Sequence, residues 1–529
     1  MLRVLKSLKV EILLFALVFF SHGYFYSGTG WNHVARYNTV YSLVNPDTPD
    51  YGTFRIDYYM AHPPRGAGTG DWARYDGNYY SNKAPGSSIL GAVLYFFLFH
   101  AQRAIGINPM QPIWITFNEY FINLFVSVFW TALGALVFFR FLQKRYHFRP
   151  IDAFLATLIF GFCTLMFPFD GGFWGHTTAA AMILIGYHHL EQGQRPGLAG
   201  LMLGLAVLVE YMAAISLAVA AAYLLVLPGR RAQVTRFVGG AVPSIAALFV
   251  YHKLCFGSFF TTGASLSDTL RRIEDGRAIA FGQFGAFQMD VFWNLLFSLD
   301  RGIFIYMPVL LFAFPGALCL LKKGDGAWMS ACMLNIVLYV GAISCYIFWD
   351  GGWSTGARYL IVALPFFCFL LPSLDSMSRK TLTIYIVLAA LSFLNMLAIV
   401  TVEVMAPDWS NPLYSEVYKR FITGNFNENR LFFESLRHWL NSQAIPPNRF
   451  NLGQLLFDLK GHLSLIPWAA VTSALVFIIY RGVMNPDQAD LHYKSKYYRQ
   501  QLQQDRLQAR GGVFPVNLFP FTKEKRSDL

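Results

Sequence analysis

The chain has 529 residues, of which 55% are hydrophobic and only 14% are charged. Soluble domains carry about 25% charged residues, so this composition excludes an ordinary water-soluble protein and indicates a polytopic membrane protein. The formal net charge is +12, which could suggest a nucleic-acid partner. However, the basic residues fall in short clusters between apolar runs, the pattern of loops at an anionic cytoplasmic surface, so we expect no nucleic acid.

Apolar stretches that predict membrane spans recur along the chain, near residues 8–25, 114–140, 151–169, 174–190, 235–254, 303–321, 327–348, 359–373, 381–402 and 464–480. The first has the basic start of a signal peptide, but no small-residue cleavage site follows, so we expect a helix that stays. A further apolar stretch, 197–227, is interrupted by Glu210 and Tyr211 and has basic residues at both ends. This pattern favours a hairpin of two short helices with Glu210 near its tip.

Residues 87–106 leave two alternatives, because they could cross the membrane or lie along its interface. If they cross, Lys144, Arg145 and Arg149 fall outside the cell. If they form an interfacial amphipathic segment, these residues fall inside, as the positive-inside rule prefers. We adopt the interfacial alternative, which gives about 12 transmembrane helices, both termini in the cytoplasm and basic inside loops.

The predicted fold is therefore an all-α polytopic membrane protein with one transmembrane domain over residues 1–480. Its first extracytoplasmic loop, 26–113, contains interfacial helices, and a second long extracytoplasmic loop covers 403–463. Residues 481–529 are polar and basic, which predicts a cytoplasmic tail.

Two aspartates in the first loop are candidate catalytic bases. Asp57 lies between Ile56 and Tyr58 in an apolar and aromatic stretch, where partial desolvation raises the pKa of a carboxylate and increases its basicity. Asp71 precedes Trp72 in "GTGDWARY". A solvated loop residue or a helix N-cap is the plainer interpretation of either aspartate.

Four cations are candidates for binding phosphate. Lys83 follows the tyrosine-rich "YYSN" and precedes the turn-forming "APG" at the start of an apolar segment, where its ammonium would meet lipid headgroups. Arg36, Arg301 and Arg358 lie at the ends of predicted spans or in outward loops, and a guanidinium can bind two phosphate oxygens at once. Interfacial anchoring is the alternative for each of them.

His176 and Glu210 are ionisable residues at the edge of or within apolar stretches. An ionisable group at membrane depth is costly, so we expect both in a substrate pocket. A structural ion pair with a nearby arginine is the alternative for Glu210.

Six cysteines lack the paired short spacing of a zinc site or a disulfide framework. No aspartate cluster points to a divalent metal, although two separated loops could still build one. We therefore expect no cofactor. The chain has no P-loop, HExxH or GxSxG motif, which disfavours nucleotide hydrolysis and metalloprotease chemistry.

The outward motifs carry a family resemblance. The "ARY" element that contains Arg36, the tyrosine-rich "YYSNKAPG" before an interfacial helix, and the later "GGWSTGARYL" together resemble the GT-C superfamily of integral membrane glycosyltransferases. Closest in organisation are the protein O-mannosyltransferases and the aminoarabinose transferases that modify lipid A. The likeness in span order covers roughly residues 1–400, whereas the motifs match only in the first loop and at a few span ends.

The resemblance implies transfer of a sugar from a polyprenyl-phosphate donor to a lipid, glycan or protein acceptor on the outer face, with inversion. It also implies that Lys83 contacts the lipid phosphate and that Arg36 and Tyr37 form the arginine-tyrosine pair of these enzymes. Tyr79 and Tyr80 then cover the sugar or the isoprenoid, and Asn82 belongs to the same substrate pocket.

The sequence departs from the aminoarabinose transferases where they have an acid a few residues before the arginine, because this chain has Asn32 and His33 there. We therefore expect Asp57 to be the base, and Asp71 to be the second choice. An acceptor that is itself a phosphate is already ionised and needs no strong base.

Two other functions remain open. A transporter or flippase of lipid-linked sugars would also need outward cations and a membrane-embedded glutamate. A polymerase or ligase of surface glycans shares the transferase chemistry and differs in its acceptor. The bacterial inner membrane is the expected location, with an endoplasmic reticulum protein as the alternative.

Overall fold

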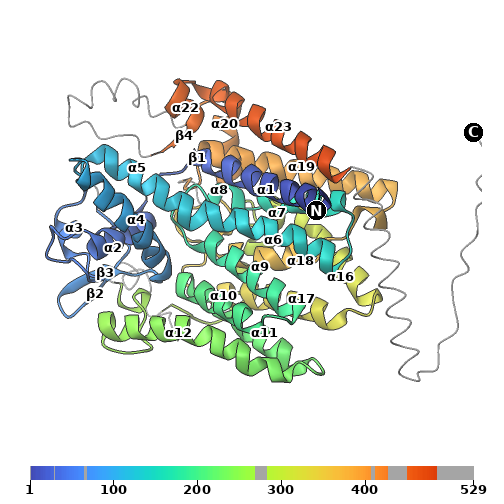
Figure 1. Ribbon diagram of the computed structural model, residues 1–529, viewed down its shortest axis with the longest axis horizontal. Helices are drawn as coiled ribbons and strands as arrows, with labels where there is room; N and C mark the ends of the chain where they lie inside the picture. The colour runs from blue at the N-terminus through green and yellow to red at the C-terminus, as the bar shows by residue number, and fades with distance from the viewer. Residues whose placement is uncertain are drawn as a thin grey trace, which may run out of the picture.

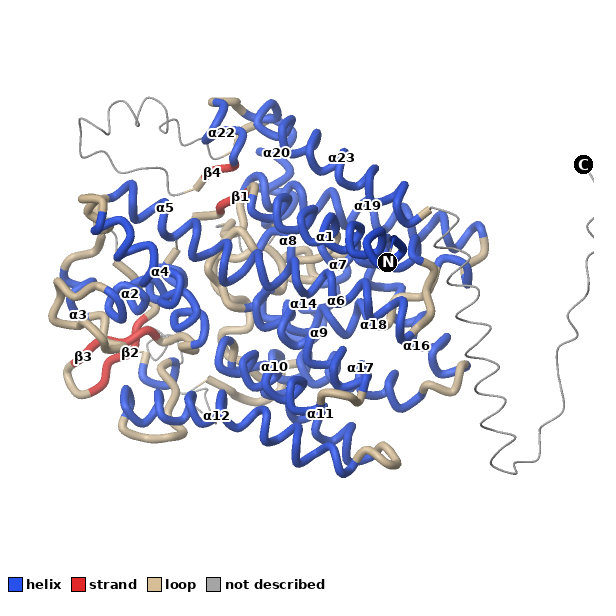
Figure 2. Tube along the Cα trace, in the orientation of Figure 1, coloured by secondary structure: helices blue, strands red, loops and turns tan. Residues whose placement is uncertain are grey.

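The computed structural model describes residues 2–28, 30–64, 68–267, 283–406, 411–426 and 449–484, with side chains from residue 9 onward. This part of the chain is mainly helical, and its two sheets have two strands each (Figure 2). The strands are β1 (Phe25–Tyr26), β2 (Trp72–Tyr75), β3 (Asn78–Ser81) and β4 (Phe450–Asn451). The predicted tail begins at residue 481, and its residues 485–529 lie outside the described part.

The α-helices are α1 (Leu2–Gly23), α2 (Trp31–Val44), α3 (Asp57–Ala61), α4 (Gly86–Ala104), α5 (Pro112–Asn123), α6 (Phe129–Arg145), α7 (Pro150–Phe162), α8 (Met166–Phe169), α9 (His176–Gln192), α10 (Pro196–Val209), α11 (Ala214–Val226), α12 (Val234–Phe256), α14 (Met289–Phe297), α15 (Ile303–Tyr306), α16 (Ala313–Lys322), α17 (Gly326–Ser344), α18 (Leu364–Phe369), α19 (Arg379–Val402), α20 (Lys419–Thr423), α22 (Leu452–Phe457) and α23 (Ile466–Val483). Short 3₁₀ or π segments are η1 (Leu124–Val128), η2 (Tyr211–Ala213), η3 (Arg231–Gln233), η4 (Ala264–Leu266), η5 (Pro308–Phe312), η6 (Arg358–Ala363), η7 (Leu374–Ser376), η8 (Leu413–Tyr418) and η9 (Gly461–Leu465).

Within the described residues, five continuous helices are long and apolar enough to cross a membrane, and five shorter apolar helices accompany them. The chain is thus a multi-pass membrane protein, as its composition predicts. The count of about twelve spans stays a prediction. Three of the expected spans are interrupted, because 151–169 divides into α7 and α8, 303–321 into α15, η5 and α16, and 359–373 into η6 and α18. Pro308 begins η5, and a proline removes one backbone donor from a helix.

The predicted hairpin over 197–227 is confirmed. α10 ends at Val209, Glu210 has an extended backbone, and η2 and α11 return in the opposite direction. α10 packs closely against α12, because a Cβ at Gly200 would lie only 1.8 Å from the carbonyl oxygen of Phe237. This close backbone contact fixes the position of α10, and with it the position of Glu210 at its end.

A network of ion pairs joins helix ends on the face opposite Glu210. Arg145 at the end of α6 binds Glu191 of α9 at 2.6 Å and Asp325, which precedes α17, at 2.6 Å. Arg230, between α11 and α12, donates to the carbonyl oxygen of Leu190 at 2.8 Å. The loops predicted to be basic and cytoplasmic around 145 and 230 therefore meet at one face.

α2, α4 and the β2–β3 hairpin gather at one end of the helical bundle (Figure 1). α4 packs chiefly against α2, and the interfacial placement of 87–106 stays a prediction. The continuous helix Pro112–Arg145 has 34 residues, which corresponds to about 51 Å and exceeds the ~30 Å hydrocarbon layer. Its first part, α5, therefore reaches out of the bundle toward this end.

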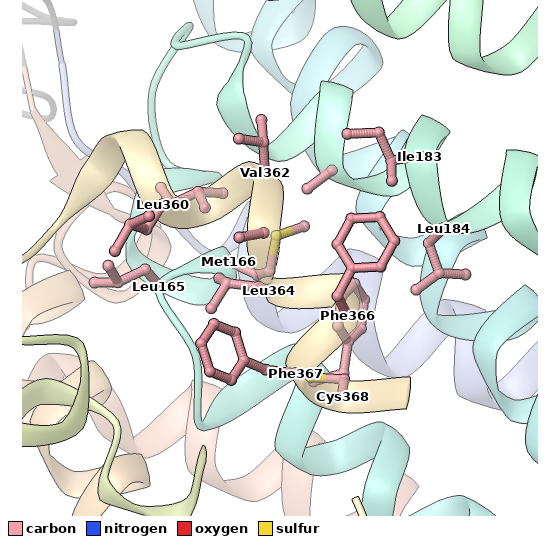
Figure 3. Packing of buried hydrophobic residues seen from close by; sticks show 14 of the residues in the cluster. Leu165, Met166, Ile183, Leu184, Leu360, Val362, Leu364, Phe366, Phe367 and Cys368 are labelled. Atoms are coloured by element: carbon pink, nitrogen blue, oxygen red, sulfur yellow. The ribbon is translucent and has the colours of Figure 1, made fainter. Parts of the chain in front are cut away.

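The core beneath this end is apolar and close-packed. Side chains from α8 and its preceding loop, α9, η6 and α18 interdigitate there (Figure 3), among them Leu165, Met166, Ile183, Leu184, Leu360, Val362, Phe366 and Phe367. This packing fixes the start of α9 and the start of η6, the two segments that carry His176 and Arg358.

Candidate functional site

The β2–β3 hairpin brings Asp71 and Lys83 together. Its turn residues Asp76 and Gly77 have positive φ angles of 49° and 78°, the conformation that favours Asp-Gly in a two-residue hairpin turn. The strands pair from Tyr75↔Asn78 to Trp72↔Ser81, so the residues just outside them lie at the same end. Lys83 Nζ lies 3.1 Å from Asp71 Oδ2, and both side chains are about one-fifth exposed.

Arg36 projects from α2 and is almost fully buried, with 2% of its surface exposed. Its Nε donates to Asn32 Oδ1, its Nη1 to the carbonyl oxygen of Ala84 at 3.2 Å, and its Nη2 to that of Trp174 at 2.7 Å. Ala84 directly follows Lys83, and Trp174 precedes α9. Arg36 therefore ties the hairpin exit and the start of α9 to α2.

His176 and Glu210 form a hydrogen-bonded pair between the first residue of α9 and the break after α10. His176 Nδ1 lies 2.8 Å from Glu210 Oε2, with side-chain exposures of 3% and 14%. The two residues were predicted for a substrate pocket, and the structure shows that they contact each other directly.

Arg358 lies on an aromatic platform at the start of η6. Its guanidinium carbon lies 4.9 Å from the ring centre of Trp174 and 5.1 Å from that of Tyr359, and its Nη2 donates to the Tyr359 hydroxyl at 3.3 Å. Its Nε is buried and has no hydrogen-bond partner among the described residues. The residue as a whole remains partly exposed.

The charges of these groups act on one another. Arg36 interacts with Glu210, Asp71 and Arg358, and Glu210 interacts with Lys83 as well as with Arg36 and His176. Arg358 in turn interacts with Asp71. We call this set the charge cluster and define it by its six members, which are Arg36, Asp71, Lys83, His176, Glu210 and Arg358. They come from segments that are far apart in the sequence.

Asp57 has different neighbours. Its Oδ1 accepts the Tyr79 backbone N–H at 2.9 Å, and its Oδ2 is buried without a hydrogen-bond partner in the described chain. Burial raises its pKa, as its apolar sequence context predicts, and its charged neighbours are Asp50 and Arg55. The Asp57 carboxylate therefore accepts a hydrogen bond from β3, and its role as a base stays a prediction.

Arg301 binds backbone carbonyl oxygens and one carboxylate. It is 1% exposed, its Nε donates to the Asp350 carbonyl oxygen at 2.7 Å, and its Nη2 donates to that of Gly352 at 2.9 Å. It also pairs with Asp300. Arg301 thus holds the 350–352 turn that leads to Arg358.

The remaining predicted pocket residues lie around the hairpin and α2. Tyr79 contacts Trp72 at a ring-centre distance of 5.1 Å, whereas Tyr80 is buried, 8% exposed. The Asn82 Nδ2 donates to Ser267 at 3.4 Å. Tyr37 is 1% exposed, and its hydroxyl donates to the Glu119 carbonyl oxygen.

Two further groups beside the cluster were not predicted from the sequence. His33 Nδ1 accepts the Gly30 backbone N–H at 2.9 Å, and its ring meets Trp174 at 4.2 Å. The Tyr211 hydroxyl lies 3.1 Å from His252 Nε2. The His33–Trp174 and Tyr211–His252 contacts depend on how helices pack, so a histidine or aromatic residue next to a predicted site residue is their only sequence signal.

Metal binding finds no support in the part of the chain that the structure describes. No group of three or more His, Cys, Asp or Glu side chains there could hold a metal ion.

No protein-family model and no curated protein matches this chain. Among solved structures, it is similar to ArnT from Cupriavidus metallidurans bound to undecaprenyl phosphate, with a TM-score of 0.44 and 12% identity, over 91% of this chain and 75% of that one. It is also similar to the Archaeoglobus fulgidus oligosaccharyltransferase in the apo form, with a TM-score of 0.36 and 12% identity, over 83% of this chain and 60% of that one. Both TM-scores are below 0.5, so the likeness carries no argument about function, which has to be argued from this chain's own residues.

Proposed function

We propose that this protein is a membrane-embedded glycosyltransferase. It moves a sugar from a polyprenyl-phosphate-linked donor to a lipid, glycan or protein acceptor on the extracytoplasmic face of the membrane, with inversion at the anomeric carbon. The observation that carries this proposal is the charge cluster, in which two partly exposed cations, Lys83 and Arg358, meet carboxylates at one end of a membrane helix bundle.

The cations suit a phosphate leaving group. When the bond between the sugar and the phosphate breaks, negative charge grows on the phosphate, and fixed cations in a site shielded from water stabilise that charge. Arg358 presents a planar guanidinium whose Nε has no protein partner in the described chain, and such a group can bind two phosphate oxygens. Lys83 supplies a compact point charge.

The lipid part of the donor has an apolar surface beside Lys83. α4 begins three residues after Lys83 and exposes Val93, Phe96 and Phe97, of which Phe97 is 64% exposed. In a membrane protein, such a face contacts lipid chains. A phosphate at Lys83 would therefore lie at headgroup depth while its polyprenyl chain follows α4.

Arg36 and Arg301 have positioning roles in this scheme. The backbone contacts of Arg36 hold the hairpin exit against α9, and those of Arg301 hold the turn before Arg358. Neither guanidinium needs to touch the substrate to set the distance between Lys83 and Arg358.

Binding of a polyprenyl monophosphate in detergent tests the donor site. We expect saturable binding by the wild type that weakens in both Lys83→Met and Arg358→Met, while Lys144→Met, an exposed lysine at the other end of α6, binds normally. Equal binding by all four proteins would contradict the phosphate site. A transporter would bind the same lipid but move it across liposomes without breaking the sugar-phosphate bond, so intact donor after incubation with acceptors separates the two functions.

A further inference from the structure

We infer that the His176–Glu210 pair is the general base of the reaction, and that the acceptor is therefore a neutral hydroxyl. This inference rests on the proposed function and adds the class of acceptor. The sequence favours Asp57 or Asp71 as the base. In the structure, however, Asp57 has its contacts outside the charge cluster, and Asp71 Oδ2 is bound to the Lys83 ammonium.

The pair defines which nitrogen of His176 is basic. Glu210 Oε2 lies 2.8 Å from His176 Nδ1, and an ionised carboxylate only accepts hydrogen bonds, so Nδ1 carries the proton. The lone pair of a neutral His176 is then on Nε2. That nitrogen is buried and has no hydrogen-bond partner among the described residues. A histidine oriented by a carboxylate, with its other nitrogen free, is the arrangement that general bases use.

Cations surround the pair. Arg36 and Lys83 lie near Glu210, and Arg36 and Arg358 lie near His176. His33 of α2 also faces His176. As the proton arrives on Nε2 during reaction, the Glu210 carboxylate stabilises the imidazolium.

The ring of His176 lies next to the phosphate-binding candidate. It contacts Trp174 at a ring-centre distance of 6.4 Å and Tyr359 at 5.6 Å, and these two rings also flank the Arg358 guanidinium. His176 and Arg358 therefore share an aromatic frame, which places the base close to a cation that can hold the reacting phosphate.

The step balances as a single displacement. The acceptor O–H gives its proton to His176 Nε2, and the oxygen lone pair forms the new bond to the anomeric carbon. The bond between that carbon and the phosphate oxygen breaks, and its electron pair leaves with the polyprenyl phosphate. The imidazolium then returns its proton to water.

His176→Asn tests the role, because the asparagine Nδ2 can replace Nδ1 as a donor to Glu210 but offers no second basic nitrogen. We expect unchanged thermal unfolding and unchanged polyprenyl monophosphate binding, with a turnover number lower by about 10²–10⁴-fold. In Glu210→Gln the hydrogen bond survives without the charge. Because the carboxylate favours the protonated imidazole, its loss should shift the acid limb of the pH–rate profile to lower pH.

A structural role for the pair would lower stability and leave the acid limb in place, and that result would overturn the inference. Turnover that survives in His176→Asn but collapses in Asp71→Asn would also overturn it, while the transferase function would stand. If wild-type protein prefers a phosphate acceptor over a hydroxyl acceptor, the hydroxyl assignment fails. No release of polyprenyl phosphate from any donor by wild type would instead remove the proposed function itself.

Discussion

Replacing Lys83 by methionine separates phosphate binding from folding. Lys83 Nζ and Asp71 Oδ2 are 3.1 Å apart, and their side chains are 19% and 20% exposed. Such a pair lies between an exposed pair, worth up to about 1 kcal/mol, and a buried pair, whose breaking costs about 3–5 kcal/mol. A hydrogen bond from an ammonium to a charged phosphate is worth about 1.5–3 kcal/mol, which corresponds to a roughly 10- to 150-fold larger dissociation constant. Lys83→Met should therefore stay folded at the assay temperature while binding polyprenyl monophosphate much more weakly.

The companion variant Asp71→Asn gives the opposite expectation. Asp71 competes with the ligand for the Lys83 ammonium, so its neutralisation should leave phosphate binding unchanged or tighter. Both affinities can be measured by lipid-phosphate titration in detergent, and the unfolding temperatures by differential scanning fluorimetry. Binding by Lys83→Met within about twofold of wild type, or an unfolding temperature that falls enough to explain the loss, would refute the assignment.

Three further predictions concern residues outside the reacting groups. Burial raises the pKa of Asp57 above its ordinary 3.8, so ionisation of this carboxyl destabilises the folded state. As pH rises from about 4 to 7, Asp57→Asn should therefore become more stable relative to wild type. A difference in unfolding temperature between the two proteins that does not change with pH would contradict this. Arg301→Met removes the donor to two part-buried carbonyl oxygens and should cost at most about 1–3 kcal/mol per group along with phosphate affinity. Arg379→Met at an exposed site should change neither. Gly200→Ala forces a Cβ to within 1.8 Å of a backbone oxygen and should destabilise by about 1–3 kcal/mol, while Gly239→Ala on α12, which meets nothing within 4 Å, serves as the control in thermal unfolding.

Local patterns predicted the parts of the site that a single segment determines. The charges on both sides of 197–227 indicated a helical hairpin with Glu210 near its tip, and the structure has this arrangement. The apolar neighbours of Asp57 predicted its raised pKa. In both cases the deciding interactions involve residues close in the sequence.

The partners of these residues could not be predicted in the same way. His176 meets Glu210 because α9 and α10 pack side by side, and no periodicity within either helix specifies that contact. Lys83 meets Asp71 through the β2–β3 hairpin. The Asp76-Gly77 turn was a readable signal for that hairpin, but the predominance of apolar helices in the composition pointed away from strands.

Interrupted spans set a second limit. Hydropathy treats 303–321 as one apolar segment, yet the backbone there divides into α15, η5 and α16. A window of about 19 residues averages over such breaks, so it locates apolar segments well but counts continuous helices poorly.

The most direct test of the account is release of free polyprenyl phosphate by the reconstituted protein, supplied with a panel of polyprenyl-phosphate sugars and membrane acceptors that offer a hydroxyl. We expect release that requires an acceptor, remains in Asp57→Asn, and falls by about 10²–10⁴-fold in His176→Asn. Absence of release with every donor, together with intact lipid-linked sugar appearing on the opposite side of the liposome membrane, would contradict it and identify a transporter.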